Sequence, residues 1–106
     1  MATTAPSCCG GSLDRHLDGA AARRGAEMAK ALADPVRVQL FDLLRGHARA
    51  VCQCELQPLF GVSQPTLSHH LAKLASAGLV SVERRGRWAY YSIDDDVLEE
   101  LRSWLS

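Results

Sequence analysis

Four cysteines in two tight pairs are the residues of this 106-residue chain best suited to chemistry. Cys8 and Cys9 are adjacent, and Cys52 and Cys54 flank a single glutamine. Thiolates select soft or borderline ions, and three or four of them together suit trivalent arsenic or antimony, lead, cadmium or zinc. In a reducing compartment, such pairs are metal-binding or redox groups before they are structural disulfides. The sequence therefore predicts a thiolate site for a metal or metalloid ion.

The backbone around Cys52 and Cys54 decides whether both thiols can reach one ion. Residues two apart differ by about 200° around a regular helix, so the pair converges only where the chain is extended or is just entering a helix. Ala50-Val51 before the pair and Glu55-Leu56 after it fit such a boundary. Two alternatives remain for the thiols: a buried structural cysteine with an inert tail, or a redox or sulfur sensor.

Helix start and stop signals surround the second cysteine pair. The composition becomes helical over residues 13–33, with glycines that should soften the helix. Asp34-Pro35 starts a second helix, because aspartate caps free amide groups and proline is tolerated in the first turn. Gly46 ends that helix. A short third helix is predicted over residues 55–60, with Gly61 as its stop.

The segment after this short helix completes a helix-turn-helix. Ser63-Gln64-Pro65 is a start signal, and Leu67, Leu71 and Leu74 recur at helical spacing before Gly78. The three leucines lie within about 60° of one another on a helical wheel and should face the core. A short helix, a glycine-containing turn and a second helix form the two-helix unit of this motif.

The opposite face of this helix carries short polar groups, amides and cations, which suit base edges and phosphates in a major groove. Two segments typical of strands, residues 79–83 and 88–93, follow it, and the arginines between them belong to a hairpin tip that can contact phosphates or a minor groove. A solvated face is the alternative for the helix alone, and His70, nearer the leucines, is expected to be structural. The predicted DNA-contacting residues are Ser63, Gln64, Thr66, Ser68, His69, Lys73, Arg84, Arg85 and Arg87.

The distribution of charge supports this assignment although the formal net charge is zero. Over residues 63–93 basic residues outnumber acidic ones by three, whereas over residues 94–106 acidic residues outnumber basic ones by four. The basic excess lies where a polyanion would be met. The acidic segment begins a last helix, and its apolar stripe consists of Val97, Leu98, Leu101, Trp104 and Leu105.

Length and composition, with 47% hydrophobic and 23% charged residues, indicate one folded domain. We expect residues 1–12 to form a flexible tail carrying Cys8-Cys9, and residues 13–106 to form a DNA-binding and dimerisation domain. Because the first thirty residues are charged and no stretch approaches roughly 18 apolar residues, we expect a cytoplasmic protein without a membrane partner. No phosphate-binding loop and no nucleophile with a placed base occurs, so we expect no enzyme.

Four ordered motifs resemble the ArsR/SmtB family of metal-sensing repressors, over roughly residues 27–105. They are Ala31–Arg37, Val62–Leu71, Ala77–Val80 and Arg85–Tyr91. The resemblance implies a winged helix-turn-helix that is mainly α-helical with a small β-hairpin, and a homodimer joined through the first and last helices. It also implies binding to double-stranded, palindromic operator DNA and release by an inducer. It implies no other protein partner and no permanently bound cofactor.

The cysteine segments carry a resemblance of their own. Val51–Leu56 resembles the Cys-x-Cys-(Asp/Glu)-Leu motif of arsenic-, cadmium- and lead-responsive members, and Cys8-Cys9 resembles tail cysteines that in some members cross the dimer. The tail pair is adjacent here, as in some arsenic sensors, whereas cadmium and lead sensors space it further apart. The resemblance implies arsenic(III) or antimony(III) as inducer, with cadmium(II) or lead(II) as alternatives, and all four cysteines as ligands. The family's other site needs histidines on the last helix, and residues 94–106 contain none.

Overall fold

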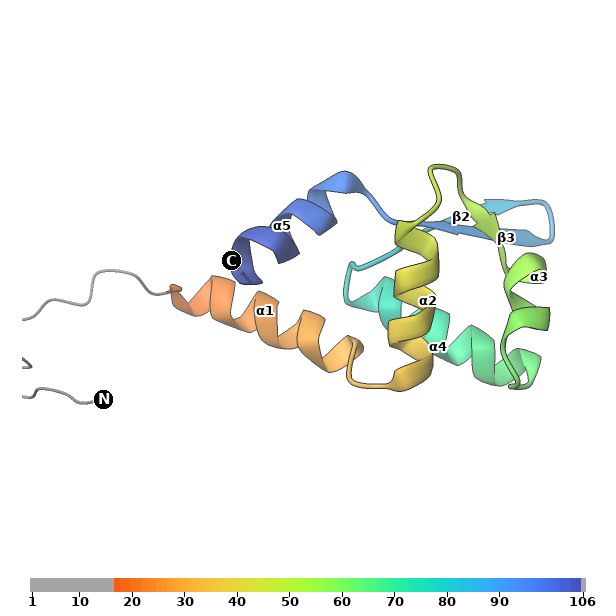
Figure 1. Ribbon diagram of the computed structural model, residues 1–106, viewed down its shortest axis with the longest axis horizontal. Helices are drawn as coiled ribbons and strands as arrows, with labels where there is room; N and C mark the ends of the chain where they lie inside the picture. Colours follow the sequence, from red (N-terminus) through yellow and green to blue (C-terminus); the bar gives the residue numbers. More distant parts are fainter. Residues whose placement is uncertain (1–16, 106) are drawn as a thin grey trace, which may run out of the picture.

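A computed structural model describes residues 17–105 of the chain. The elements in order are α1 (Gly19–Ala31), α2 (Pro35–Arg45), β1 (Val51–Cys52), α3 (Gln53–Leu56), the 3-10 turn η2 (Gln57–Leu59), α4 (Gln64–Ser76), β2 (Ser81–Arg85), β3 (Trp88–Ser92) and α5 (Asp95–Leu105). The helices α2, α3 and α4 pack near the sheet, while α1 and α5 extend together from the other end (Figure 1). This is the predicted winged helix-turn-helix architecture.

Side-chain caps start the helices α2 and α4 where the sequence predicts them. Asp34 accepts the N–H of Val36 at 2.8 Å, and Pro35 occupies the first turn of α2. Ser63 accepts the N–H of Thr66 at 3.3 Å at the start of α4. Each cap satisfies an amide that has no partner inside its helix, which stabilises the helix by about 1 kcal/mol.

One apolar core joins the helices to the sheet. The side chains that are buried almost completely are Met28, Leu40, Leu44, Leu56, Leu67, Leu71, Leu74 and Leu79. The three predicted core leucines of α4 are among them, which confirms the predicted orientation of that helix. Burial of each such side chain contributes about 1.5–3 kcal/mol relative to its exposure to water. The opposite face of α4 is thereby left toward solvent.

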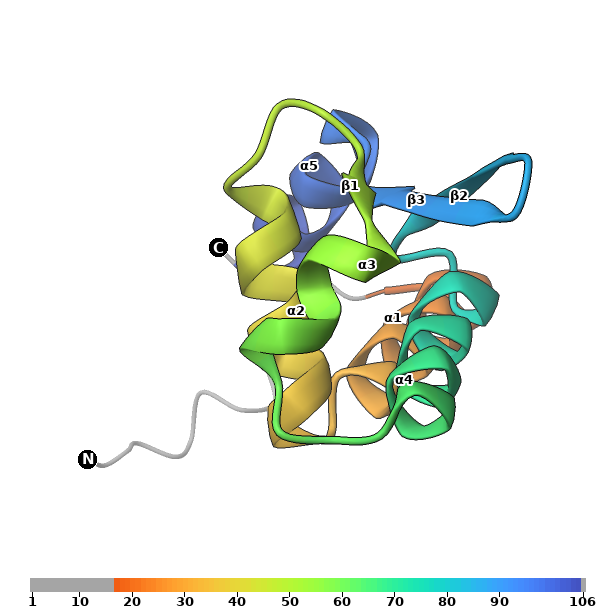
Figure 2. The same ribbon diagram turned by 90° about the vertical axis from the view of Figure 1, so that its right-hand side faces the viewer.

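The sheet has three antiparallel strands in the order β1-β3-β2. The sequence predicted only the β2–β3 hairpin, which projects as the wing in Figure 2. The added strand β1 pairs Val51 with Tyr91 and Cys52 with Tyr90. A strand of two residues shows no alternation of apolar and polar side chains, so the sequence could not reveal it. Its pairing fixes the first residue of the cysteine pair to the base of the wing.

The third helix is shorter and begins earlier than the sequence predicts. It spans Gln53–Leu56 and continues as the 3-10 turn Gln57–Leu59. Pro58 has no N–H to continue the α-helical hydrogen bonds, which accounts for the change of helix type. Within residues 17–105, no helix is long and apolar enough to span a membrane.

The helices α1 and α5 meet at a glycine. Gly25 is buried, and a Cβ added there would lie 2.6 Å from the Trp104 ring. The glycine that was expected to soften α1 therefore permits a close contact between the two helices. Arg24 connects the same pair, with its Nε 3.2 Å from the Glu100 carboxylate, and it also donates a hydrogen bond to the Ala77 carbonyl at the end of α4.

Candidate functional site

The cysteine pair lies at a strand-to-helix boundary, as predicted from its spacing. Cys52 ends β1 with extended backbone, and Cys54 lies in the first turn of α3. Their sulfur atoms are 2.6 Å apart. Cys52 is buried, whereas Cys54 is exposed to solvent. The two thiols therefore converge on one point, and that point is open on the side of Cys54.

A capping box holds this turn in place. The Cys52 sulfur accepts the Cys54 N–H at 3.3 Å, and the Glu55 carboxylate accepts the Cys52 N–H at 2.9 Å. Arg49 holds the other oxygen of Glu55 at 3.0 Å. The hydrogen bond from Arg49, followed by that from the Cys52 N–H, holds the pKa of Glu55 below its ordinary value. The backbone around the thiols is thus fixed from both sides.

The environment of Cys54 raises the pKa of its thiol and so disfavours the thiolate. Its hydrogen bond to the Cys52 sulfur raises the Cys54 pKa, and partial desolvation and the nearby Glu55 charge act in the same direction. Ions bind thiolates, so a bound ion must displace this proton. A pair of convergent sulfur atoms fits a soft ion. Among residues 17–105, no group of three cysteine, histidine or acidic side chains is placed to hold a metal ion, and Cys8 and Cys9 lie outside this part of the chain.

The predicted DNA face of α4 is largely open to solvent. Gln64, Thr66, His69 and Lys73 are exposed, and Ser68 is partly buried. The Ser63 hydroxyl is engaged at the start of the helix, where it lies 2.9 Å from the Thr66 hydroxyl oxygen.

His70, which was expected to be structural, lies on the inner side of α4. Its Nδ1 is 3.0 Å from Arg37 Nη1, and 4.0 Å from the Asp34 carboxylate. These contacts join α4 to the start of α2. His70 is therefore engaged within the fold, away from the exposed face of α4.

The three arginines of the wing have different surroundings. Arg85 lies over the Tyr90 ring at 4.2 Å and forms an ion pair with Glu83 at 3.0 Å. Arg87 lies over the Trp88 ring at 5.5 Å. The side chains of Arg84, Arg85 and Arg87 are all exposed. Arg84 and Arg87 face the body of the molecule across a cleft, whereas Arg85 is occupied by its neighbours on the hairpin.

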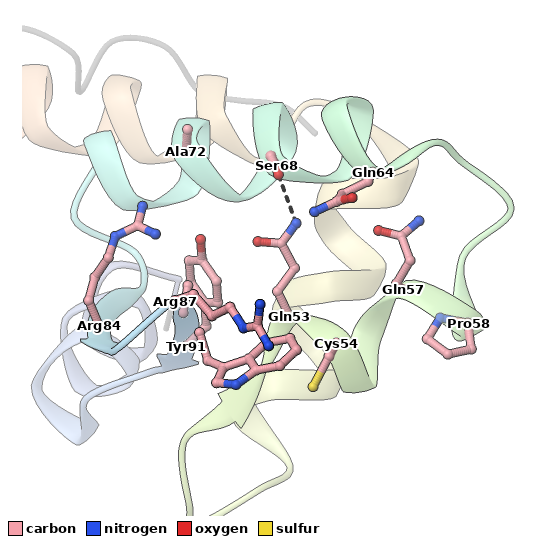
Figure 3. A pocket seen from close by; sticks show the side chains of 12 residues that line it. Gln53, Cys54, Gln57, Pro58, Gln64, Ser68, Ala72, Arg84, Arg87 and Tyr91 are labelled. Carbon is pink, nitrogen blue, oxygen red and sulfur yellow. Dashed lines mark hydrogen bonds between the residues drawn. The ribbon is translucent and has the colours of Figure 1, made fainter.

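An open cleft of about 730 Å³ separates α3, α4 and the wing (Figure 3). The cleft is lined by residues that the sequence analysis singled out for separate reasons. They are Cys54 of the thiol pair, Gln64 and Ser68 of α4, and Arg84 and Arg87 of the wing. A polyanion seated in the cleft would face two guanidinium groups and the polar flank of α4. The exposed thiol lies in the wall of the surface that suits DNA.

Sequence reasoning missed two glutamines that line this cleft. Gln53 donates a hydrogen bond to the Ser68 hydroxyl at 2.7 Å. Gln57 donates to the Val62 carbonyl at 2.7 Å, and its Oε1 is buried without a hydrogen-bond partner in the described structure. Periodicity does not mark either residue, because each acts through one specific hydrogen bond, to another helix for Gln53 and to the following turn for Gln57. The only available signal was the place of Gln53 between two cysteines.

Comparisons with known proteins agree on one family of regulators. The model of the arsR family of bacterial regulatory proteins matches residues 34–82. The transcriptional repressor SdpR of Bacillus subtilis is 36% identical over 72% of this chain and 82% of its own. The arsenical resistance operon repressor of the same species is 36% identical over 76% of each chain.

A solved structure agrees with these relatives. The crystal structure of a possible transcriptional regulator for arsenical resistance is 32% identical and has a TM-score of 0.64. The match covers 74% of this chain and 79% of that one. The matched family region contains both cysteines of the second pair, the whole of α4 and the start of the wing.

Proposed function

This chain belongs to the ArsR family and is a transcriptional repressor rather than an enzyme, and from this premise we propose that arsenic(III) or antimony(III) releases it from operator DNA. The observation that carries the proposal is the convergence of the Cys52 and Cys54 sulfur atoms, 2.6 Å apart, beside the cleft formed by α4 and the wing. Two relatives are each 36% identical to this chain, and one of them is named for arsenical resistance whereas the other is not. The inducer is therefore argued from the thiols.

The four cysteines are the proposed ligands. Cys52 and Cys54 provide two convergent donors, and an ion held by them needs at least one further thiolate to match the three or four that such ions favour. Cys8 and Cys9, in the tail of residues 1–12, are the proposed source. Each thiol that binds loses its proton, so ion affinity falls as the pH is lowered through the titration range of the thiols.

Operator binding is assigned to α4 and the wing. Gln64, Thr66 and His69 are exposed near the start of α4, which is the part of a recognition helix that reaches base edges. Arg84 and Arg87 are placed across the cleft, where phosphates would be met. The phosphate contacts supply the part of the affinity that falls as the salt concentration rises.

A homodimer through α1 and α5 would present two such surfaces to a palindromic operator. The support for it is the apolar surface at these helices. Trp104 is 39% exposed and Leu17 is 50% exposed, and both line a groove of about 170 Å³ between α1 and α5. Leu98 and Leu101 are partly buried on α5. Exposed apolar patches of this kind mark protein interfaces.

The test is a fluorescence anisotropy titration of a labelled operator duplex selected from a random pool. Wild-type protein should lose operator affinity by about 5- to 150-fold on addition of arsenite or antimonite, the usual range of such coupling. The Cys52→Ser/Cys54→Ser double variant should bind operator and no longer respond. The titration includes cadmium(II) and lead(II), the alternative inducers. Full release of the double variant at the same ion concentrations would overturn the proposed site.

A thiol-redox sensor is the second candidate, and the 2.6 Å separation of the two sulfur atoms favours it. A peroxide would take two electrons and two protons from the Cys52 and Cys54 thiols, leaving a disulfide and water. The same titration with hydrogen peroxide separates the two functions. Release by peroxide that dithiothreitol reverses, without release by arsenite or antimonite, would select the redox sensor.

A further inference from the structure

Gln53 lies between the two cysteines, and its side chain extends toward α4. Its Nε2 donates a hydrogen bond to the Ser68 hydroxyl at 2.7 Å, and Figure 3 shows this bond crossing from α3 to α4. Both side chains are partly buried, so water competes less with the bond than it would at an exposed site. The thiol pair is thus one residue away from direct contact with the helix that carries Gln64 and Lys73.

The arrangement of the two thiols has to change when they share an ion. The Cys52 sulfur caps α3 by accepting the Cys54 N–H, and lone pairs that turn to an ion weaken this cap. The sulfur atoms are now 2.6 Å apart, whereas two thiolates bound to one ion at the zinc–sulfur distance of about 2.3 Å, with a tetrahedral angle between the bonds, are separated by roughly 3.8 Å. Because the backbone of Gln53 lies between the cysteines, a change in their separation moves Gln53.

The other end of the bond lies on the flank of the proposed DNA face. Ser68 follows Gln64 by one turn of α4 and lines the same cleft. A hydrogen bond to Ser68 restrains the rotation of α4 relative to α3 near the end that meets DNA. A shift at Gln53 therefore reaches the DNA-contacting side chains without passing through the core.

We infer that Gln53 is a positioning residue that couples the thiol site to α4: the Gln53–Ser68 hydrogen bond stabilises the DNA-binding arrangement, and occupation of Cys52 and Cys54 breaks it. The inference rests on the proposed function, since it provides a route for the release of DNA. An ion shifts an equilibrium only by its different affinity for the two arrangements. The net contribution of one hydrogen bond corresponds to about 2- to 12-fold in that equilibrium.

The test compares Gln53→Leu with Gln39→Leu. The first variant keeps much of the side-chain volume and removes the amide, and the second is a matched control at an exposed position of α2. For each protein, two ratios are measured: the operator Kd with and without arsenite, and the arsenite Kd with and without operator. Coupling between two ligands is reciprocal. Gln53→Leu should therefore lower both ratios by the same factor, about 2- to 12-fold, while Gln39→Leu keeps the wild-type ratios.

A second variant tests whether Gln53→Leu simply impairs folding. A folding defect would weaken the binding of operator and of arsenite, but it would not lower the two Kd ratios by the same factor. Ser68→Ala removes the other end of the bond and suits a helix. The Gln53→Leu/Ser68→Ala double variant should show the same lowered ratios as each single variant, because both remove one interaction. Wild-type ratios in Gln53→Leu and Ser68→Ala would overturn this inference and leave the proposed function intact. Failure of arsenite to release the wild-type protein would overturn both.

Discussion

Glu55 connects the thiol segment to the loop that precedes it. One carboxylate accepts the Cys52 N–H and an Arg49 guanidinium, so the charged form is stabilised in the folded protein. The pKa of Glu55 is lowered first by Arg49 and then by the Cys52 N–H. The same negative charge contributes to the raised pKa of the Cys54 thiol. Glu55 thus stabilises the turn and disfavours ionisation of the thiol beside it.

This arrangement predicts how the contribution of Glu55 to the free energy of unfolding depends on pH. A carboxyl with a lowered folded-state pKa contributes stability that is present above its unfolded-state pKa, about 4.3, and is lost as the pH falls through the folded-state value. Glu55→Gln should therefore unfold at lower urea concentration than wild type at pH 7, and the difference should narrow as the pH falls below about 4. Urea titrations at several pH values measure it, with Glu27→Gln on α1 as control. A difference that is constant with pH would contradict the role given to the carboxylate.

At the scale of single residues, the sequence predicts chemistry better than it predicts contacts. Cys52 and Cys54 were found from residue type and spacing, and the structure places their sulfur atoms together. Gln53 was missed because its partner, Ser68, lies fifteen positions away on another helix. A single glutamine carries no periodic signal. Only the tertiary fold, which places α3 across the cleft from α4, turns Gln53 into a bridge between the two helices.

Among the elements, the contact of α1 with α5 depends on Gly25. A Cβ at this position would lie 2.6–2.9 Å from three atoms of the Trp104 indole. Trp104 also borders the groove that we propose for the dimer interface. A displaced indole would therefore disturb both the packing of the two helices and the surface they present to a second subunit.

Gly25→Ala tests this contact, because two opposing effects act at the same position. Alanine in a helix gains up to about 1 kcal/mol over glycine, whereas overpacking costs typically about 1–3 kcal/mol. We expect the variant to be less stable than wild type in urea titrations at fixed protein concentration. Gly19→Ala is the control, because a Cβ there meets only Arg23 at 3.6 Å, and it should be neutral or stabilising. Equal stability gains in both variants would show that α1 and α5 do not meet as described.

The elements also differ in how far the sequence predicts them. The start of α2 and that of α4 follow from local caps at Asp34 and Ser63, which act within three residues. The strand β1 depends on pairing with β3 about forty positions later, as in Val51 with Tyr91. Non-local pairing of a two-residue segment leaves no local pattern to recognise. Caps were therefore predicted well, and the third strand was not.

At the scale of the whole molecule, Arg24 joins three helices. It pairs with Glu100 of α5 and donates to the Ala77 carbonyl at the end of α4, next to Gly78, which ends the helix with a φ of +76°. The guanidinium thus connects the proposed dimer helices to the far end of the proposed recognition helix. The thiol pair acts near the start of that helix through Gln53. The two ends of α4 are consequently held by different parts of the molecule.

The same geometry bears on which subunit of the proposed dimer would complete the proposed ion site. The beginning of α1, from which the chain leads back to Cys8 and Cys9, lies at the opposite end of the described structure from α3 (Figure 1). The eight residue steps from Cys9 to Leu17 span at most about 28 Å. A tail supplied by a second subunit joined through α1 and α5 is therefore the arrangement that we expect to reach Cys52 and Cys54.

Mixed dimers decide between a site within one chain and a site shared by two. We predict that chains with Cys8→Ser/Cys9→Ser respond weakly to arsenite and that chains with Cys52→Ser/Cys54→Ser do not respond. When the two kinds of chain are unfolded together and refolded as mixed dimers, a shared site places the intact tail of one chain beside the intact pair of the other. Such dimers should bind about one arsenite with near wild-type affinity and regain part of the operator release, since only one of two sites is complete.

Isothermal titration of mixed dimers measures the binding, and the two kinds of chain carry different affinity tags so that the mixed dimers can be purified. The parent variants, refolded alone in the same way, serve as controls. A site formed within each chain would leave every mixed dimer without a complete ligand set, so arsenite binding no tighter than that of the parents would contradict the shared site.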